Sequence, residues 1–298
     1  MKLNHPHLNG SRFLIAGAGG GFDIFGGLPL AFELLNQRND NVVLANYSVR
    51  ASSTEYLYRE STDEDYPEGA LSKTGLKVYT FPKLGVQLLK KAYEEIIKLH
   101  NIDCVILADG GVDSLMHGNE AEAGTFFEDS ISLAAVSALD VPHKYLMCIG
   151  FGTEIEENLN HYRVLENIAK FAQQGGFLGT CSLTKEMESY KFYKQACLAA
   201  WQDKRKSHIH TRIIPSIEGE FGDFKMYEEI DAHVTSASNN KPFVSPLSSI
   251  MWFFDLNTVA KNNLYVTKLT PSGTFIDARM ILRSQMIPPT RDKQVIPL

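Results

Sequence analysis

Short apolar runs alternate with helical patterns through the first half of the chain, and this alternation constrains the fold more than any other feature. Strands are predicted at 13–19, 41–48, 76–82, 102–111 and 145–152, and helices between them at 28–39, 85–100 and 126–140. Strands that alternate with helices form crossover connections and a mostly parallel sheet. Two of the strands, 102–111 and 145–152, are apolar throughout, as strands covered on both faces are. We therefore predict an α/β fold of three layers: a mostly parallel, Rossmann-like sheet with helices on both faces.

The second half of the chain has a different pattern. A helix at 154–176, a strand at 177–183 and a long helix at 185–206 are predicted in turn, and the segment 209–224 is predicted as a strand, with Pro215 near its end, followed by a turn. The segment 245–263 is predicted as a helix or as a strand followed by a helix, and the tail as a helix followed by Pro-rich coil. Because no low-complexity linker divides the chain, we expect a single domain over residues 1–298. In it, a ligand-binding half (12–153) and a second half (154–298) share one sheet, with a C-terminal extension packed on it.

The composition excludes several classes of function. The chain has 35 acidic and 29 basic side chains, a formal net charge of −6, and no basic cluster apart from residues 204–206. This balance argues against a nucleic-acid partner. No apolar stretch approaches the ~20 residues of a membrane span, and the N-terminus has no signal-peptide pattern. The four cysteines form no CxxC pair, so we expect reduced thiols in a cytoplasmic protein.

A glycine-rich segment, residues 17–27, joins the first predicted strand to the first predicted helix. Its bare amides are typical of loops that bind an anion before a helix, and the predicted ligand-binding residues are Gly17, Gly19, Gly20 and Gly21. It is neither a dinucleotide fingerprint, because Phe22 stands where the last glycine belongs, nor a Walker A loop, because no Gly-Lys-Ser/Thr follows. The alternative is a tight turn that packs the helix closely on the sheet. Asp23 would repel phosphate, which favours Mg²⁺, a sugar hydroxyl or an amine near the loop.

An acidic segment, residues 108–130, follows the predicted strand 102–111. Ligands of open parallel sheets bind beyond the carboxyl ends of the strands, so Asp109 should lie at the same rim as the glycine-rich segment. Carboxylates there can bind Mg²⁺ or a ribose diol, or act as general acids and bases. We predict Asp23, Asp109 and Asp113 as catalytic residues and the last two also as metal ligands. Gly110 and Gly111 are predicted to bind the ligand.

Further predicted ligand-binding residues follow other strands or begin a helix. Asn46 and Ser48 stand where the second strand of a nucleotide-binding unit contacts the ribose, and Arg50 beside them would tolerate a phosphoryl group. Glu154 follows the strand 145–152. Glu128 and Asp129 open a predicted helix, where acids serve equally well as dipole partners or as site residues.

Other polar residues are given structural interpretations. Glu120 and Glu122 are expected to be solvated loop charges. His117 lies between Asp113 and Glu120, but the spacing matches no metal signature, so metal ligation by His117 is disfavoured. The remaining histidines, His210 among them, are expected on the surface.

Three segments carry a resemblance to a known family. The pairing of AGAGGGFDIFGGLPLAFEL with ILADGGVDSLMHGNEAEAGTFFEDSISLAAV resembles the DUF1152 family, and SPLSSIMWFFDLNTVAKNN is similar to its FDL-x-x-VA-x-x-N pattern. The resemblance covers the chain from about residue 12 to residue 264. It implies a Rossmann-like fold and motif positions at Asp23, Asp109, Asp113, Glu128 and Asp129, but no activity.

Two functions stay open on the sequence. The first is an enzyme that binds a nucleotide or phosphorylated sugar at the glycine-rich segment and acts on it with its carboxylates, by transfer, hydrolysis or elimination. Its cofactor is undetermined, with Mg²⁺ as the one candidate. The alternative is a non-catalytic module that senses a nucleotide such as NAD(P). The number of acids expected at one rim favours the enzyme.

Other classes are disfavoured. A dehydrogenase would need the intact fingerprint and an acid for the ribose. A Ser or Cys hydrolase would need a nucleophile motif that the chain lacks. We expect a small-molecule ligand and no nucleic-acid or membrane partner, and the sequence leaves a homo-oligomer open.

Overall fold

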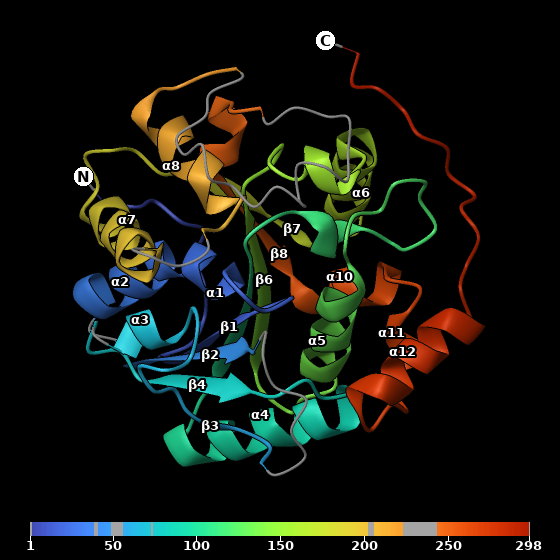
Figure 1. Ribbon diagram of the computed structural model, residues 1–298, viewed down its shortest axis with the longest axis horizontal. Coiled ribbons are helices and arrows are strands. Elements are labelled where there is room, and N and C mark those ends of the chain that lie inside the picture. The colour runs from blue at the N-terminus through green and yellow to red at the C-terminus, as the bar shows by residue number, and fades with distance from the viewer. Residues whose placement is uncertain are drawn as a thin grey trace.

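A single eight-stranded sheet forms the centre of the molecule (Figure 1). The computed structural model describes residues 2–38, 41–48, 56–72, 74–201, 206–222 and 243–297. The strands are β1 (Arg12–Gly17), β2 (Asn41–Tyr47), β3 (Arg59–Glu60), β4 (Val78–Phe81), β5 (Cys104–Asp109), β6 (His143–Ile149), β7 (Phe177–Ser182) and β8 (Ile250–Asp255). Across the sheet their order is β3-β4-β2-β1-β5-β6-β8-β7, so strands from both halves of the chain share it.

The middle of the sheet is parallel and its two edges are not. β4, β2, β1, β5 and β6 pair in parallel with their neighbours. β3 is antiparallel to β4, and β8 is antiparallel to both β6 and β7. The prediction of an α/β fold with a mostly parallel sheet is confirmed, and the antiparallel edges make the sheet mixed.

The helices lie between and after the strands. They are α1 (Asp23–Gly26), α2 (Leu28–Arg38), α3 (Gly69–Ser72), α4 (Val86–His100), α5 (Phe127–Ser137), α6 (His161–Gln173), α7 (Glu188–Trp201), α8 (His210–Glu218), α10 (Leu256–Asn262), α11 (Val266–Leu269) and α12 (Phe275–Ser284). Short 3-10 turns stand at η1 (Asp113–Leu115), η2 (Ile155–Glu157) and η3 (Pro246–Ser249). No helix in the described part of the chain is both long and apolar enough to cross a membrane.

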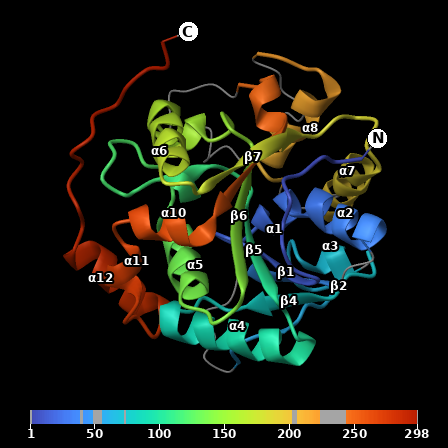
Figure 2. The same cartoon turned by 180° about the vertical axis from the view of Figure 1, so that it is seen from behind.

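Two hydrophobic cores lie on opposite faces of the sheet, because successive side chains of a strand point in opposite directions. In β1, Phe13 and Ile15 belong to one core, while Leu14 and Ala16 belong to the other. The first core includes side chains of α1, α2 and α7, and the second includes side chains of α4, α5 and α10. Figures 1 and 2 show these two groups of helices on either side of the sheet.

The predicted elements of the first half agree with the structure to within a few residues, but the strand predicted at 209–224 is wrong. Residues His210–Glu218 of that segment form α8. Ile209, Ile213 and Ile217 stand four residues apart, which is helical spacing. Pro215 argues against a helix at this position, because proline is disfavoured in a helix interior.

Two other segments differ from their predictions in detail. The helix predicted at 154–176 is divided into η2 and α6, and the side chain of Asn160 caps the start of α6. The segment 245–263 takes the second of its two predicted forms, with β8 leading directly into α10.

Truncating Ile106 tests the placement of β5 at the centre of the sheet. Ile106 is fully buried between Ile15 of β1 and Tyr145 of β6. We expect Ile106→Ala to lower the free energy of unfolding, measured by chemical denaturation, by about 2–5 kcal/mol, because the change removes buried surface and leaves a cavity. The control is Ile276→Ala on α12, where the side chain is 67% exposed. It should change stability by less than about 0.5 kcal/mol, and equal losses in the two variants would contradict the placement.

Candidate functional site

A large cavity opens where β1, β5 and β6 end. In chain order the five parallel strands run 3-2-1-4-5 across the sheet, so the order reverses between β1 and β5. Ligands of such sheets bind at this reversal, beyond the carboxyl ends of the strands. The cavity has a volume of about 1050 Å³. Its polar lining comes from the glycine-rich segment, the end of β5, the start of α5, the turn after β6 and residues 206–208.

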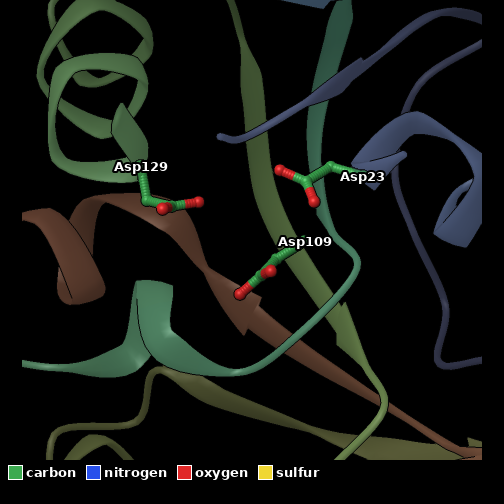
Figure 3. Close-up of side chains that lie close together, drawn as sticks. All are labelled: Asp23, Asp109 and Asp129. Atoms are coloured by element: carbon green, nitrogen blue, oxygen red, sulfur yellow. The ribbon is translucent and has the colours of Figure 1, made fainter. Parts of the chain in front are cut away.

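Three aspartates converge in this cavity from three elements (Figure 3). Asp23 begins α1, Asp109 ends β5, and Asp129 lies in the first turn of α5. One oxygen from each carboxylate lies within 4.8 Å of the other two. We call these residues the aspartate group; its three oxygens are close enough together to share one cation.

Hydrogen bonds from neighbouring residues fix Asp23 and Asp109 but not Asp129. The amide of Gly19 donates to Asp23 Oδ2 at 2.5 Å, and the hydroxyl of Ser114 donates to Asp109 Oδ2. Asp129 is only 4% exposed, yet it accepts no hydrogen bond from another residue in the described part of the chain. Its carboxylate is therefore both buried and available to a ligand.

A second group of acids lines the same cavity. Asp113, Glu154 and Glu157 also bring one oxygen each within 4.8 Å of the other two, and we call them the mixed acid group. Thr125 donates to Asp113 Oδ2 from its amide at 2.9 Å and from its hydroxyl at 3.0 Å. The amide of Val112 donates to Glu154 Oε2 at 2.6 Å. The cavity thus holds two adjacent sets of oxygen ligands.

The cavity contains far more negative than positive charge. Seven acids line it, including Glu128, and the described lining residues that can carry positive charge are Lys206 and His208. His208 Nε2 lies 2.9 Å from Glu157 Oε1, and Glu128 pairs with Lys83 outside the lining at 2.5 Å. The aspartate group therefore has no cationic partner of its own among these residues.

Burial and mutual repulsion raise the pKa values of five of these acids. The pKa of Glu157 is lowered instead, because its interaction with His208 outweighs its burial. Burial raises the pKa of Asp109 to about 6. Burial, and then the charge of Asp109, raise the pKa of Asp23 and that of Asp113 well above the usual range. The pKa values of Asp129 and Glu154 rise for the same reason, with Asp113 as the main neighbouring charge. Buried like charges must either bind protons or be neutralised by a cation.

Glycines allow the acids to approach the backbone so closely. A Cβ on Gly19 would lie 2.9 Å from Asp23 Oδ2 and 3.2 Å from the Asp129 carboxylate. A Cβ on Gly111 would lie 2.6 Å from the Glu154 carboxylate. These glycines therefore leave room for carboxylates of the protein itself. The Gly19 amide, predicted to bind a ligand, already donates to Asp23.

The structure brings most of the predicted site residues to the cavity. Its lining includes Gly19, Gly20, Gly21, Asp23, Asp109, Asp113, Glu128, Asp129 and Glu154. Predicted residues that lie outside the lining are Gly17, Asn46, Ser48, Gly110 and Gly111. Arg50 lies outside the described residues.

Asn46 supports the glycine-rich segment from behind. Its side chain is fully buried and donates to Gly21 O at 2.7 Å and to Glu68 Oε1 at 2.7 Å. A Cβ on Gly17 would lie 2.0 Å from Asn46 Oδ1, so glycine is required there for packing. The arrangement gives Asn46 a positioning role beneath the loop.

Several residues at the site were not predicted. Glu157 stands three residues after Glu154, a spacing that puts both on one face of a 3-10 turn. Thr125 and His208 also line the cavity. Of these, only the Glu154–Glu157 spacing is visible in the sequence.

The expectation of a surface position for His210 is wrong. His210 is fully buried; its Nε2 donates to Phe22 O at 2.8 Å and its Nδ1 accepts from the Tyr193 hydroxyl at 2.7 Å. Burial lowers the pKa of His210 to about 4, so the ring is neutral and keeps its proton on Nε2. It anchors the residue before Asp23 to α7 and α8. Its partners are far away in the sequence, which is why the pattern did not show this role.

The expectation of a solvated charge at Glu120 is also wrong. Glu120 is 4% exposed and accepts hydrogen bonds from the amides of His117 and Gly118. Arg291, near the end of the chain, donates to Glu120 Oε1 at 2.6 Å. Glu122 is partly exposed and pairs with Lys293 at 2.8 Å. The C-terminal tail therefore holds the acidic loop in place.

The fold and the site together define an α/β protein with an acid-lined cavity at the carboxyl ends of its parallel strands. Residues 49–290 match the model of a family described as "Protein of unknown function (DUF1152)". The match covers most of the chain, which belongs to this family. No curated protein and no solved structure matches the chain.

The raised pKa values predict how stability depends on pH. Without metal, the folded protein keeps protons that the unfolded chain has already released, so the free energy of unfolding should fall as the pH rises from about 4 to about 7. For Asp109 alone, whose pKa moves from 3.8 to about 6, the loss is about 3 kcal/mol. Denaturation in EDTA across this range measures the slope. A stability that rises over the same range would contradict the charge balance described.

Neutralising Asp129 should stabilise the metal-free protein. We expect Asp129→Asn to raise Tm by a few degrees at pH 7.5 in EDTA, because it replaces, at nearly constant volume, a carboxyl group that the folded protein must bury either charged or with a proton taken up from solution. At pH 4, where the acids are protonated in both proteins, the difference should disappear. Asp140→Asn, at an exposed acid outside the cavity, is the matched control and should leave Tm unchanged at both pH values.

Proposed function

We propose that this protein is an enzyme that binds divalent cations of the Mg²⁺ type in its acidic cavity and acts on a nucleotide or phosphorylated sugar. The observation that carries the proposal is the convergence of six carboxylates, in two groups of three, on one cavity that has few cations of its own. The reaction would be a transfer, a hydrolysis or an elimination at the phosphorylated substrate.

The chemistry of the ligands supports a hard divalent cation. Every candidate ligand is a carboxylate oxygen, which Mg²⁺ and Ca²⁺ prefer over softer metals. The aspartate group would hold one ion and the mixed acid group a second. Asp109 and Asp113, both expected as metal ligands from the sequence, fall in different groups. Cations would relieve the repulsion that burial imposes on these acids.

A phosphorylated substrate is compatible with this charge balance once cations are bound. Phosphate would enter a cavity lined by seven acids, so it needs cations to bind there at all. The lining also includes Tyr66, Phe126 and Phe127, which offer flat apolar surface to a base or sugar ring. A cavity of about 1050 Å³ has room for a ligand the size of a nucleotide.

The chain's own residues would supply binding and orientation. Bound cations would neutralise the phosphate and provide an activated water. Ser114 and Thr125 fix the carboxylates of Asp109 and Asp113 by hydrogen bonds. His208, paired with Glu157 in the lining, stands where it can hold a proton during turnover. His210 and Asn46 would keep the glycine-rich segment in position.

The fold agrees with this proposal. We propose that the 3-2-1-4-5 order of the parallel strands and the two groups of helices correspond to a three-layer, Rossmann-like arrangement. The four cysteines are free. Reduced thiols are typical of the cytoplasm, where we place the protein.

Activity with Mg²⁺ or Mn²⁺ on a panel of nucleotides and sugar phosphates tests the proposed function. We expect turnover that EDTA abolishes, and an Asp109→Asn variant that loses about 100-fold or more in turnover, the usual cost of removing an electrostatic stabiliser. Asp140→Asn is the control, and circular dichroism confirms that each variant is folded.

Two results would contradict the proposed enzymatic function. Turnover that neither EDTA nor the Asp109→Asn substitution reduces would exclude the proposed role of the acids. Tight binding of NAD(P) without metal and without turnover would instead support the alternative function, a non-catalytic module that senses a nucleotide.

A further inference from the structure

A second cavity lies apart from the acidic one. It has a volume of about 660 Å³ and is bounded by the C-terminal part of α6, the end of α10, the loop at residues 117–119 and Arg291 of the tail. It shares no lining residue with the acidic cavity. Three of its lining residues, His117, Lys170 and Lys261, argue for a ligand.

His117 carries a buried N–H group without an acceptor. The side chain is 5% exposed, and its Nδ1 lies 3.3 Å from Arg291 Nη1, which can only donate. The proton of the neutral ring is therefore on Nε2. Nε2 is buried and has no hydrogen-bond partner among the described residues. Leaving such a donor unpaired costs about 1–3 kcal/mol, so its position indicates an acceptor that the chain does not supply.

Burial, aided by neighbouring cations, keeps this ring neutral. Burial lowers the pKa of His117 to about 4; the charge of Glu120 acts in the opposite direction, while those of Lys170 and Arg291 add to the lowering. At neutral pH the ring is therefore a hydrogen-bond donor at Nε2 and an acceptor at Nδ1.

The charges around the cavity leave a positive surplus. Arg291 pairs with Glu120 and Glu166, and Arg163 also pairs with Glu166 at 2.8 Å. Lys170 and Lys261 form no ion pair within the described part of the chain. Four cations against two acids give a local charge of +2, in a chain whose formal net charge is −6.

The two lysines also lie in the last turns of α6 and α10. Cations there complement the helix dipoles, a role that needs no ligand. This role explains the lysines but not the unpaired N–H group of His117.

We propose that this cavity is a second binding site, which takes a phosphate group through His117 Nε2, Lys170 and Lys261. A phosphate oxygen would accept the hydrogen bond from Nε2, and the dianion would balance the surplus charge of the two lysines. The phosphate could be inorganic phosphate or the phosphate group of a small metabolite, because both present the same oxygens to the site.

The site is connected to the acidic cavity through one loop. The His117 amide donates to Glu120 Oε1 at 3.0 Å, and further along the same loop Thr125 holds Asp113. An anion bound at His117 would stabilise the start of this loop, four residues after Asp113. In the proposed enzyme, a phosphorylated product or effector could adjust the acid cluster by this route, a consequence that rests on the proposed function whereas the site itself does not.

Phosphate titration of the full chain in EDTA tests the site without metal in the acidic cavity. Isothermal calorimetry should show binding of inorganic phosphate. The Lys170→Ala/Lys261→Ala double variant should bind phosphate at least about tenfold more weakly, the equivalent of 1.4 kcal/mol. The control is Lys91→Ala/Lys98→Ala on α4, two exposed lysines that lie outside both cavities.

A spectroscopic readout identifies the atom involved. In protein labelled with ¹⁵N-histidine, the Nε2–H signal of His117 should shift as phosphate is added and should remain unshifted with acetate at equal ionic strength. A sugar phosphate that binds more tightly than inorganic phosphate would identify a metabolite as the source. Absence of phosphate binding, equal affinity in the lysine double variant, or an unmoved His117 signal would overturn the site.

Discussion

The repulsion among buried carboxylates is the constraint on which the rest of this structure depends. Asp23, Asp109 and Asp129 bring their oxygens within 4.8 Å of one another, and a second group of acids lies beside them. Such an arrangement opposes folding at neutral pH unless protons or cations neutralise it. Acids that lower the stability of the fold in this way are typical of a functional site. If they served only packing, apolar residues would stabilise the fold better.

The fold withstands this repulsion by fixing several of the acids and the segments that carry them. The carboxyl ends of parallel strands meet at one edge, which puts Asp109 beside the glycine-rich segment. Asn46 holds the loop from β2, and His210 holds it from α8. Glu154, after β6, accepts a hydrogen bond from the Val112 amide. Both halves of the chain therefore contribute to one cavity, and neither half contains the site alone.

The sequence predicted the parts of the site that local pattern determines. Asp109 and Gly19 were found because polar or bare residues follow apolar strands, and their positions depend on strand direction alone. The role of Asn46 and the burial of Glu120 and His210 depend on partners far away in the chain, such as Arg291 and Phe22. Periodicity cannot show such contacts. The helix at 210–218 was missed for a local reason, because Pro215 outweighed the spacing of the isoleucines.

The proton balance of metal binding tests the central claim most directly. If the acids hold protons at pH 7 and exchange them for a cation, then binding of Mn²⁺ must release protons. Calorimetric titration in buffers of different ionisation enthalpy counts them. We expect a binding heat that varies with the buffer, corresponding to at least one proton released per chain, and fewer protons released in an Asp129→Asn, Asp109→Asn double variant, which keeps only the mixed acid group. Absence of binding, or a heat independent of the buffer, would contradict the account.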